Sequence, residues 1–516
     1  MSPNKRIFIN IIATYGRSLY VLVIGLFCGR WALMALGEVD YGLYGLVGGM
    51  TAFVAFFNEL LAMAVGRFYA VSIGSANKVG NEIIGLEDCR KWFNTAFSIH
   101  TLVPLVLVVI GYPIGVWAVE DFLTIPADRI GSCIWVWRFT CFSCFVGMMN
   151  VPFAAMYNAK QEIAELTIYK FATATLNVVF LYYMLTHPGV WITKYAFWMM
   201  MLGVVPQAII ACRAIMKYPE CRFCKAYMWN VHRMLDISKF ALARFWTAFS
   251  GMISAQGNSI LVNKYLGPQF NASITVGNSV AGHASTLSNS LSGAFSPVIG
   301  NKAGEGKEDE VRKFAFRTCR FGSALMLVFA IPLAIEIDEV LRLWLKTPPE
   351  GAAIICLAVL IDMLLERTTE GYWMAIMSVG RGISLYSIVV SIAGFSRLVI
   401  AWCAFALGYG LHGLFVALVI ARCVACVARL ILGRKLVGMS IRYWACKVFI
   451  PLILIVVVTC AIGIIPSRYI PPSAFRVCET SLLCGLAFLP LTWFVVLTCA
   501  ERDFLIFKIR QRFMKE

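Results

Sequence analysis

Long apolar stretches recur along the sequence and constrain its fold more than any other feature. A helix needs about 20 mainly apolar residues to cross a hydrocarbon layer of about 30 Å. The 516 residues are 60% hydrophobic and only 14% charged, with a mean hydropathy of +0.77. We therefore predict an all-α integral membrane protein. Its transmembrane helices number about 14 and are expected at residues 10–34, 41–66, 93–118, 130–157, 166–186, 191–213, 240–263, 270–299, 314–336, 352–378, 384–406, 412–432, 446–465 and 476–499.

Basic residues are concentrated in alternate loops. Because cationic loops resist translocation, the loops with the Lys and Arg excess are expected on the cytoplasmic side. These loops lie within residues 67–91, 213–239, 302–320, 429–447 and 508–515. We predict that both termini are cytoplasmic. The net charge of +17 is then explained by topology and contact with anionic lipids rather than by nucleic-acid binding.

The loops offer little room for catalysis or for a metal. None is longer than about 35 residues, which excludes a separate soluble catalytic domain. Residues 300–307 (GNKAGEGK) lack the glycine spacing of a phosphate loop, and Glu308 stands where a Ser or Thr would bind magnesium. Cys221 and Cys224 form a single CxxC pair with only His232 nearby, whereas a zinc site needs further ligands. We expect no enzyme activity, no metal and no cofactor.

Two parts of the chain share an outline and indicate an internal repeat. Leu36 and Gly37 follow one predicted span, and Leu266 and Gly267 follow another. After each Leu-Gly pair comes a span that contains several polar residues, and then a basic loop. Six spans separate the copies, so both keep the same orientation, as in transporters built from parallel repeats. We predict a six-helix lobe at 1–213, a basic linker at 214–239 within a second six-helix lobe at 214–435, and two extra helices with a basic tail at 436–516.

The first segment carries a family resemblance. Residues 10–49 resemble the start of bacterial polysaccharide flippases of the MATE-like multidrug/oligosaccharidyl-lipid/polysaccharide superfamily, through an Asn, a Tyr-x-Arg, a later Arg and an LG-x-x-DYG turn. Shorter matches recur near residues 67–74, 150–160, 297–306 and 380–386. The matching residues of the first segment are Asn10, Tyr15, Arg17, Arg30, Leu36, Gly37, Asp40, Tyr41 and Gly42.

The resemblance implies a substrate and a location. It implies alternating-access transport of an undecaprenyl-diphosphate-linked oligosaccharide from the cytoplasmic to the periplasmic leaflet of the bacterial inner membrane, during assembly of O-antigen, capsule or another surface polysaccharide. It also implies a cationic cavity. Membrane lipids are expected contacts, and polysaccharide assembly enzymes and a coupling Na+ or H+ are open as partners.

Charged residues inside the predicted spans are the best candidates for function. Each costs at least about 2.5–3.5 kcal/mol near mid-membrane and therefore needs a partner, water or a role. Arg17 and Glu59 lie at similar depths in the first two spans and are predicted to pair. Arg397 and Glu366 are predicted to pair in the same way.

Three acidic residues share one helix face, and two arginines have no predicted partner. Asp362, Glu366 and Glu370 follow one another at intervals of four residues, which places them on one side of a helix. Arg138 and Arg422 have no acidic residue at the same depth on the adjoining spans.

Two interpretations of these charges remain open. In the first, the paired residues only fix helix packing. In the second, arginines line a wet cavity and bind a diphosphate, because the guanidinium fork offers two parallel donors to phosphate oxygens. The cavity set is then Arg17, Arg138, Arg397 and Arg422, and the set for ion coupling or charge balance is Glu59, Asp362, Glu366 and Glu370.

Two other functions compete with the flippase. A multidrug or small-molecule exporter coupled to Na+ or H+ would prefer an acidic and aromatic cavity, and the charges above are evenly divided between acids and arginines. A membrane-embedded sugar or acyl transferase would need a catalytic acid pair or histidine at a span end. No loop has a DxD pair, and the five histidines are scattered.

Overall fold

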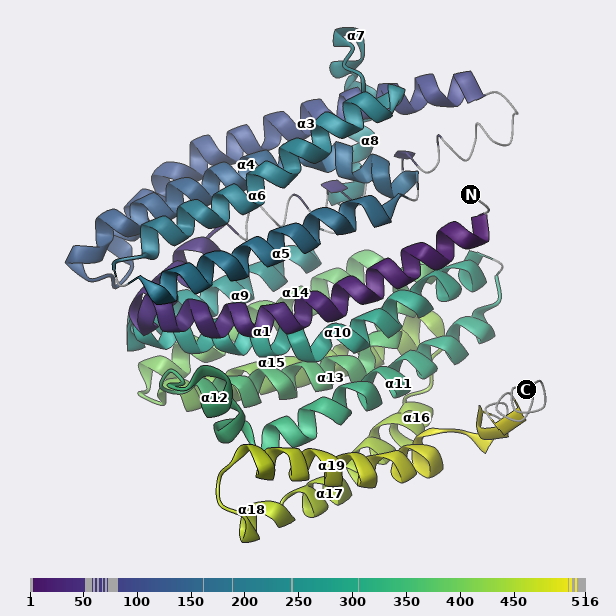
Figure 1. The fold of residues 1–516 in the computed structure, drawn as a ribbon. Coiled ribbons are helices and arrows are strands. Elements are labelled where there is room, and N and C mark those ends of the chain that lie inside the picture. The colour runs from purple at the N-terminus through teal and green to yellow at the C-terminus, as the bar shows by residue number, and fades with distance from the viewer. Residues whose placement is uncertain are drawn as a thin grey trace. The chain divides into compact units, whose positions relative to one another are not determined.

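The computed structural model describes residues 3–51, 58, 61–62, 65–66, 68–69, 72, 82–160, 162–187, 189–242, 245–304, 306–499, 501–503 and 506–507. In these residues the regular structure is entirely helical, without a strand, which confirms the predicted all-α fold (Figure 1). The helices are α1 (Pro3–Gly49), α3 (Glu82–Trp117), η1 (Ala118–Phe122), η2 (Ala127–Arg129), α4 (Ile130–Ala159), α5 (Ile163–Thr186), α6 (Ile192–Lys217), η3 (Pro219–Cys221), α7 (Lys225–Met228), α8 (Val231–Leu242), α9 (Phe245–Leu266), α10 (Pro268–Gly304), α11 (Glu308–Ile335), α12 (Ile337–Leu345), α13 (Ala352–Val379), α14 (Ile383–Ala406), α15 (Gly410–Val437), α16 (Ile441–Trp444), η4 (Ala445–Phe449), α17 (Ile450–Gly463), α18 (Ile465–Tyr469), α19 (Ala474–Leu491) and η5 (Thr492–Val496).

Nine helical segments of the described chain are long and apolar enough to span a membrane. Their outer faces carry large exposed apolar side chains, such as Val109, Ile392 and Leu489. Such surfaces are unfavourable in water and are expected where helices face lipid. The protein is therefore a multi-pass membrane protein. Helix α13 is long enough to join the nine but carries four charged residues between 362 and 370. The count of 14 and the cytoplasmic termini stay predictions.

The repeated Leu-Gly pair has the same backbone consequence in both copies. Gly37 has a φ of 76° and kinks α1, and Gly267 has a φ of 100° and separates α9 from α10. Positive φ values are open to glycine at little cost and are unfavourable for other residues. The sequence similarity of the copies thus reflects a shared break between consecutive helices.

Contacts divide the chain into two compact units, Met1–Thr275 and Val276–Glu516. The predicted bounds of the two lobes and the C-terminal extension stay a prediction. In the first unit, α4 packs on α3 and α6, and α1 packs on α5. Aromatic side chains fill its main core, where the rings of Phe93 and Phe153 lie 5.1 Å apart. Asp40 of the DYG turn accepts a 2.8 Å hydrogen bond from Nε of Arg129, so this motif residue ties α1 to the segment before α4.

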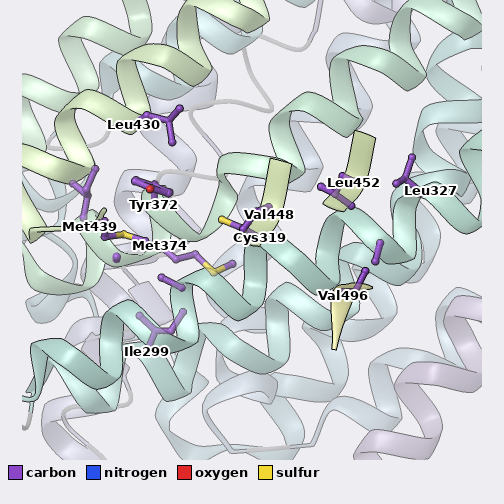
Figure 2. Packing of buried hydrophobic residues seen from close by; sticks show 14 of the residues in the cluster. Ile299, Cys319, Leu327, Tyr372, Met374, Leu430, Met439, Val448, Leu452 and Val496 are labelled. Carbon is purple, nitrogen blue, oxygen red and sulfur yellow. The ribbon is translucent and has the colours of Figure 1, made fainter. Parts of the chain in front are cut away.

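In the second unit, the C-terminal helices share one core with the helices before them. Figure 2 shows Leu327 and Cys319 of α11, Leu452 of α17 and Val496 of η5 in the same cluster of buried side chains. Tyr372 of α13 belongs to this cluster and is fully buried. The last two long helices are therefore packed against α11 as part of the unit's interior.

Charged side chains also tie α11 to the C-terminal segment at two separate places. Glu336, directly after α11, is buried and binds Nη2 of Arg476 at 2.7 Å and the hydroxyl of Thr480 at 2.9 Å. Near the middle of α11, Nη2 of Arg320 donates to both oxygens of Glu501 at 2.6 Å. We call these contacts the Glu336 clamp and the Glu501 clamp.

Candidate functional site

The acidic face predicted on α13 is present. This helix runs for 28 residues between Gly351 and Gly380, both in the left-handed conformation. Asp362 and Glu370 are buried, whereas the side chain of Glu366 is 35% exposed. Four arginines of α13, α14 and α15 surround these three carboxylates, and we call the seven residues the α13 charge cluster: Asp362, Glu366, Arg367, Glu370, Arg397, Arg422 and Arg429.

Asp362 lies at the centre of the cluster. It binds Nη2 of Arg397 at 2.9 Å. It also binds Arg422 twice, at 2.9 Å from Nε to Oδ1 and at 2.7 Å from Nη2 to Oδ2. Parallel bonds of this kind between a guanidinium and a carboxylate are among the strongest in proteins.

These contacts overturn two predictions about pairing. Arg397 pairs with Asp362 and not with Glu366, and Arg422 has acidic partners although none was expected. The reason is the helix order in space. Within the described residues, α13 packs on α11 and α15, and α14 packs on α15 rather than along α13. Residues were paired in the sequence by their depth on consecutive spans, and this criterion could not identify α15, which brings Arg422 to the acidic face of α13.

Glu366 binds two arginines of α15. Its Oε1 lies 3.3 Å from Nη1 of Arg422 and 3.2 Å from Nη2 of Arg429. Arg429 is buried and was predicted only as part of a basic loop. Because α15 extends to Val437, Arg429 belongs to the helix and shares a face with Arg422, two turns away. The spacing of seven residues was the signal that could have identified it.

Arg367 extends the cluster toward α10. Its Nη1 donates to Oε2 of Glu370 at 2.8 Å, and its Nη2 donates to Oδ1 of Asn289 at 2.6 Å. Arg367 was not among the predicted site residues. Its place within the unusually charged run at residues 366–370 was the available signal.

The cluster has more positive charge and more donors than its acids can satisfy. Four guanidinium groups face three carboxylates. The Nε atoms of Arg367, Arg397 and Arg429 are buried and have no hydrogen-bond partner among the described residues. Buried donors normally find an acceptor, so the cluster has unused capacity for water or for an added anion.

Arg138 lies in the first unit, away from this cluster in sequence. It is exposed, its Nε donates a 3.0 Å hydrogen bond to the hydroxyl oxygen of Tyr112, and its guanidinium lies 4.7 Å from the centre of a ring of Trp135. No carboxylate of the described residues pairs with it, and its predicted place in a cationic cavity stays a prediction. The side chain of Arg17 and the whole of Glu59 lie outside the described residues, so their pairing stays a prediction.

A search among known proteins identifies the fold. Residues 241–400, from α9 through most of α14, match the model of the MatE family. Among solved structures, the chain is similar to the lipid II flippase MurJ in an inward closed conformation, with a TM-score of 0.64 and 14% identity over 94% of this chain and 98% of that chain. It is also similar to a multidrug resistance MATE family transporter of the MOP superfamily. The inward-facing form gives a TM-score of 0.58 at 15% identity, covering 82% of this chain and 94% of that chain.

The chain has the fold of these transporters. The outward-facing form of the MATE family transporter matches with a TM-score of 0.52 at 15% identity, over 82% of this chain and 95% of that chain. No curated protein matches the sequence. The low identities carry no residue roles from these proteins to this one, so the roles of the predicted site residues are argued below from their own geometry.

Proposed function

We propose that the protein is a flippase that moves an undecaprenyl-diphosphate-linked oligosaccharide across the bacterial inner membrane by alternating access. The substrate enters from the cytoplasmic leaflet and leaves into the periplasmic leaflet, where it supplies assembly of a surface polysaccharide. The observation that carries this proposal is the arginine surplus of the α13 charge cluster.

The surplus favours an anionic substrate. Three buried Nε donors have no partner among the described residues, and the guanidinium groups of the cluster outnumber its carboxylates by one. A diphosphate supplies several acceptor oxygens and at least one negative charge, which is what such a cluster lacks. A cationic drug would instead need carboxylates free of arginine partners.

Glu366 suggests how binding and release can alternate. It is the most accessible of the three acids, and its Oε1 contacts both Arg422 and Arg429 at more than 3.1 Å. A diphosphate that reaches the cluster competes with Glu366 for these two arginines. When the substrate leaves, the Glu366 carboxylate takes its place, so that the arginines are never left unpaired in a low-dielectric site.

The similarity of the fold to known transporters also supports a lipid-linked substrate. The match to MurJ, which is a flippase of lipid II, covers 94% of the chain, whereas the matches to the MATE family transporter cover 82%. The larger coverage favours a lipid-linked substrate over a soluble one.

A host strain without the protein tests the proposal. We expect undecaprenyl-diphosphate-linked oligosaccharide to accumulate in the cytoplasmic leaflet, where impermeant sugar-modifying reagents added to intact spheroplasts cannot reach it. Surface polysaccharide should be lost. Normal polysaccharide together with lost drug tolerance would overturn the proposal.

Single variants locate the site within the protein. Arg422→Ala, Arg429→Ala and Arg138→Ala are compared with Arg434→Ala, which removes an exposed arginine from the end of α15. We expect the first two to abolish complementation and the control to retain it at matched protein levels. Arg138→Ala tests the predicted cationic cavity separately, because it has no carboxylate partner in the described residues.

A multidrug exporter coupled to Na+ or H+ is the second candidate, favoured by the MatE family match over residues 241–400. In that case Asp362 or Glu366 would carry the ion. Both carboxylates already contact arginines, so a coupling ion would have to displace a guanidinium. Drug accumulation assays in the same deletion strain separate the two candidates.

A further inference from the structure

A small basic pocket lies in the second unit and shares no residue with the α13 charge cluster. It has a volume of about 230 Å³. Four cations line it together with one acid, and its remaining wall is formed by Phe316, Tyr443, Val448 and Thr498. The cations are Lys313, Arg317, Arg320 and Lys447, and the acid is Glu501.

Three parts of the chain build this pocket. Lys313, Arg317 and Arg320 come from the first half of α11, where spacings of four and three residues place them on one face. Lys447 comes from η4. Thr498 and Glu501 follow η5, and the N–H and hydroxyl of Thr498 donate to Glu501 Oε2 at 3.0 Å and 2.8 Å.

The pocket is layered from inside to outside. The Arg320 side chain is only 6% exposed and forms the floor with Glu501. Burial alone would raise the pKa of Glu501, but its hydrogen bonds to Thr498 and the charge of Arg320 lower that pKa below its ordinary value. The acid is therefore ionised and fixed in the floor. Lys313 and Lys447 are exposed at the rim.

The charges of the pocket are not balanced. Glu501 binds Arg317 at 3.0 Å as well as Arg320. Glu310 lies 3.4 Å from Lys313, and Lys447 has no carboxylate partner among the described residues. Four cations thus face two acids. The buried Nε of Arg320 also lacks a hydrogen-bond partner in the described part of the chain, so a buried donor at the floor remains unused.

The predicted topology puts the pocket at the cytoplasmic surface of the membrane, where lipid phosphates are found. Its residues fall at the ends of three predicted spans, 314–336, 446–465 and 476–499, that the charge pattern assigns to the cytoplasmic side. The rings of Phe316 and Tyr443 are 4.6 Å apart in its wall. Basic side chains beside apolar surface suit a ligand with an anionic head and a hydrocarbon tail.

We propose that this pocket binds the phosphate group of an anionic phospholipid of the cytoplasmic leaflet. Lys313, Arg317 and Lys447 contact the phosphate oxygens, and Arg320 supports them from the floor. The site holds a resident lipid against α11 and the C-terminal segment. It does not depend on the transport function proposed above, and it would remain if the transported molecule were different.

Lipid titration of the full-length protein in detergent, followed by native mass spectrometry, tests this site. The probes are phosphatidylglycerol and phosphatidylethanolamine with identical acyl chains. We expect phosphatidylglycerol to bind more tightly, and the triple variant Lys313→Gln/Arg317→Gln/Lys447→Gln to weaken it by about tenfold or more, because each cation near a membrane surface contributes severalfold to affinity. The matched control, Lys225→Gln/Arg434→Gln/Lys435→Gln, removes three exposed charges elsewhere and should leave the affinity unchanged.

Two further measurements distinguish a phospholipid from other ligands that carry phosphate. Inorganic phosphate is added as a competitor, and undecaprenyl diphosphate is titrated in parallel. Displacement of phosphatidylglycerol by inorganic phosphate, or tighter binding of undecaprenyl diphosphate that the triple variant abolishes, overturns the resident-lipid proposal. So does equal binding of phosphatidylglycerol and phosphatidylethanolamine.

If the triple variant melts at a lower temperature, the single variant Lys447→Gln becomes the test of the site, because Lys447 has no ion pair in the described residues. This variant must weaken phosphatidylglycerol binding, and an unchanged affinity counts against the site.

Discussion

Arg422 of α15 and Asp362 of α13 form a bidentate ion pair, with N–O distances of 2.9 and 2.7 Å. The same Asp362 also binds Arg397 of α14 at 2.9 Å. One carboxylate thus joins three helices and neutralises guanidinium groups from two of them. This arrangement gives Asp362 a structural role that is distinct from the role proposed for Glu366.

The substitution Asp362→Asn should destabilise the protein. It keeps the size of the side chain but removes the counter-charge that Arg397 and Arg422 share, although their side chains are only 17% and 14% exposed. Breaking a buried pair in this way costs about 3–5 kcal/mol. Thermal melting of the purified protein in detergent measures the loss, with Asp338→Asn as the exposed control on α12. Equal melting temperatures for the two variants would refute the structural role.

The substitution Arg422→Lys should reduce transport even where the protein folds. A lysine keeps the charge but cannot place two parallel donors on Asp362 while also reaching Glu366. Loss of one charge-assisted hydrogen bond of about 1.5–3 kcal/mol corresponds to a decrease of at least about tenfold. Complementation at matched protein levels measures it. Arg434→Lys is the control, and full activity of Arg422→Lys would show that charge alone suffices.

The substitution Gly371→Ala should weaken the packing of α11 on α13. A Cβ at residue 371 would lie 1.9 Å from the carbonyl oxygen of Ala315, so the two backbones would have to separate. Small residues permit such close helix approach in membranes. Gly322→Ala is the matched control on α11, because its nearest neighbour, an oxygen of Glu370, would be 4.0 Å away.

For Gly371→Ala we expect a lower melting temperature, and for Gly322→Ala an unchanged or higher one, since alanine favours the helix by about 1 kcal/mol over glycine. Equal melting temperatures for Gly371→Ala and Gly322→Ala would contradict the close approach of α11 to α13 at Gly371.

Alanine at Gly37 and at Gly267 should each destabilise the protein to a similar extent. Their φ values of 76° and 100° are strained for any residue with a Cβ, at a cost of about 1–3 kcal/mol. Gly111→Ala, in open space within α3, serves as the control. Melting curves of the three variants test whether the repeated turn has the same importance in both copies. A stability loss at one glycine only would argue against equivalent turns.

The sequence was sufficient for the fold class and insufficient for the pairing of charges. Apolar length and the Leu-Gly pairs are local signals, so the helices and the breaks at Gly37 and Gly267 could be predicted. The same is true of the acidic face of α13, which depends only on helical periodicity. All of these follow from residues that are close in sequence.

The partners of that acidic face depend on which helix packs beside α13. Consecutive spans suggested α14, whereas α15 supplies Arg422 and Arg429. Arg367 and Asn289 meet across 78 residues of sequence, and nothing in the spacing of either residue indicates this contact. The charged residues could therefore be selected from the sequence, but their connections could not.

The Glu336 clamp and the Glu501 clamp have a practical consequence for studies of motion. They hold α19 and the segment after it to α11 at two separated places, through Arg476 and Arg320. A pair of spin labels on the exposed faces of α11 and α19 should keep a constant separation throughout the transport cycle. Such a pair would provide an internal ruler, against which distances that do change elsewhere in the protein can be calibrated in the same sample.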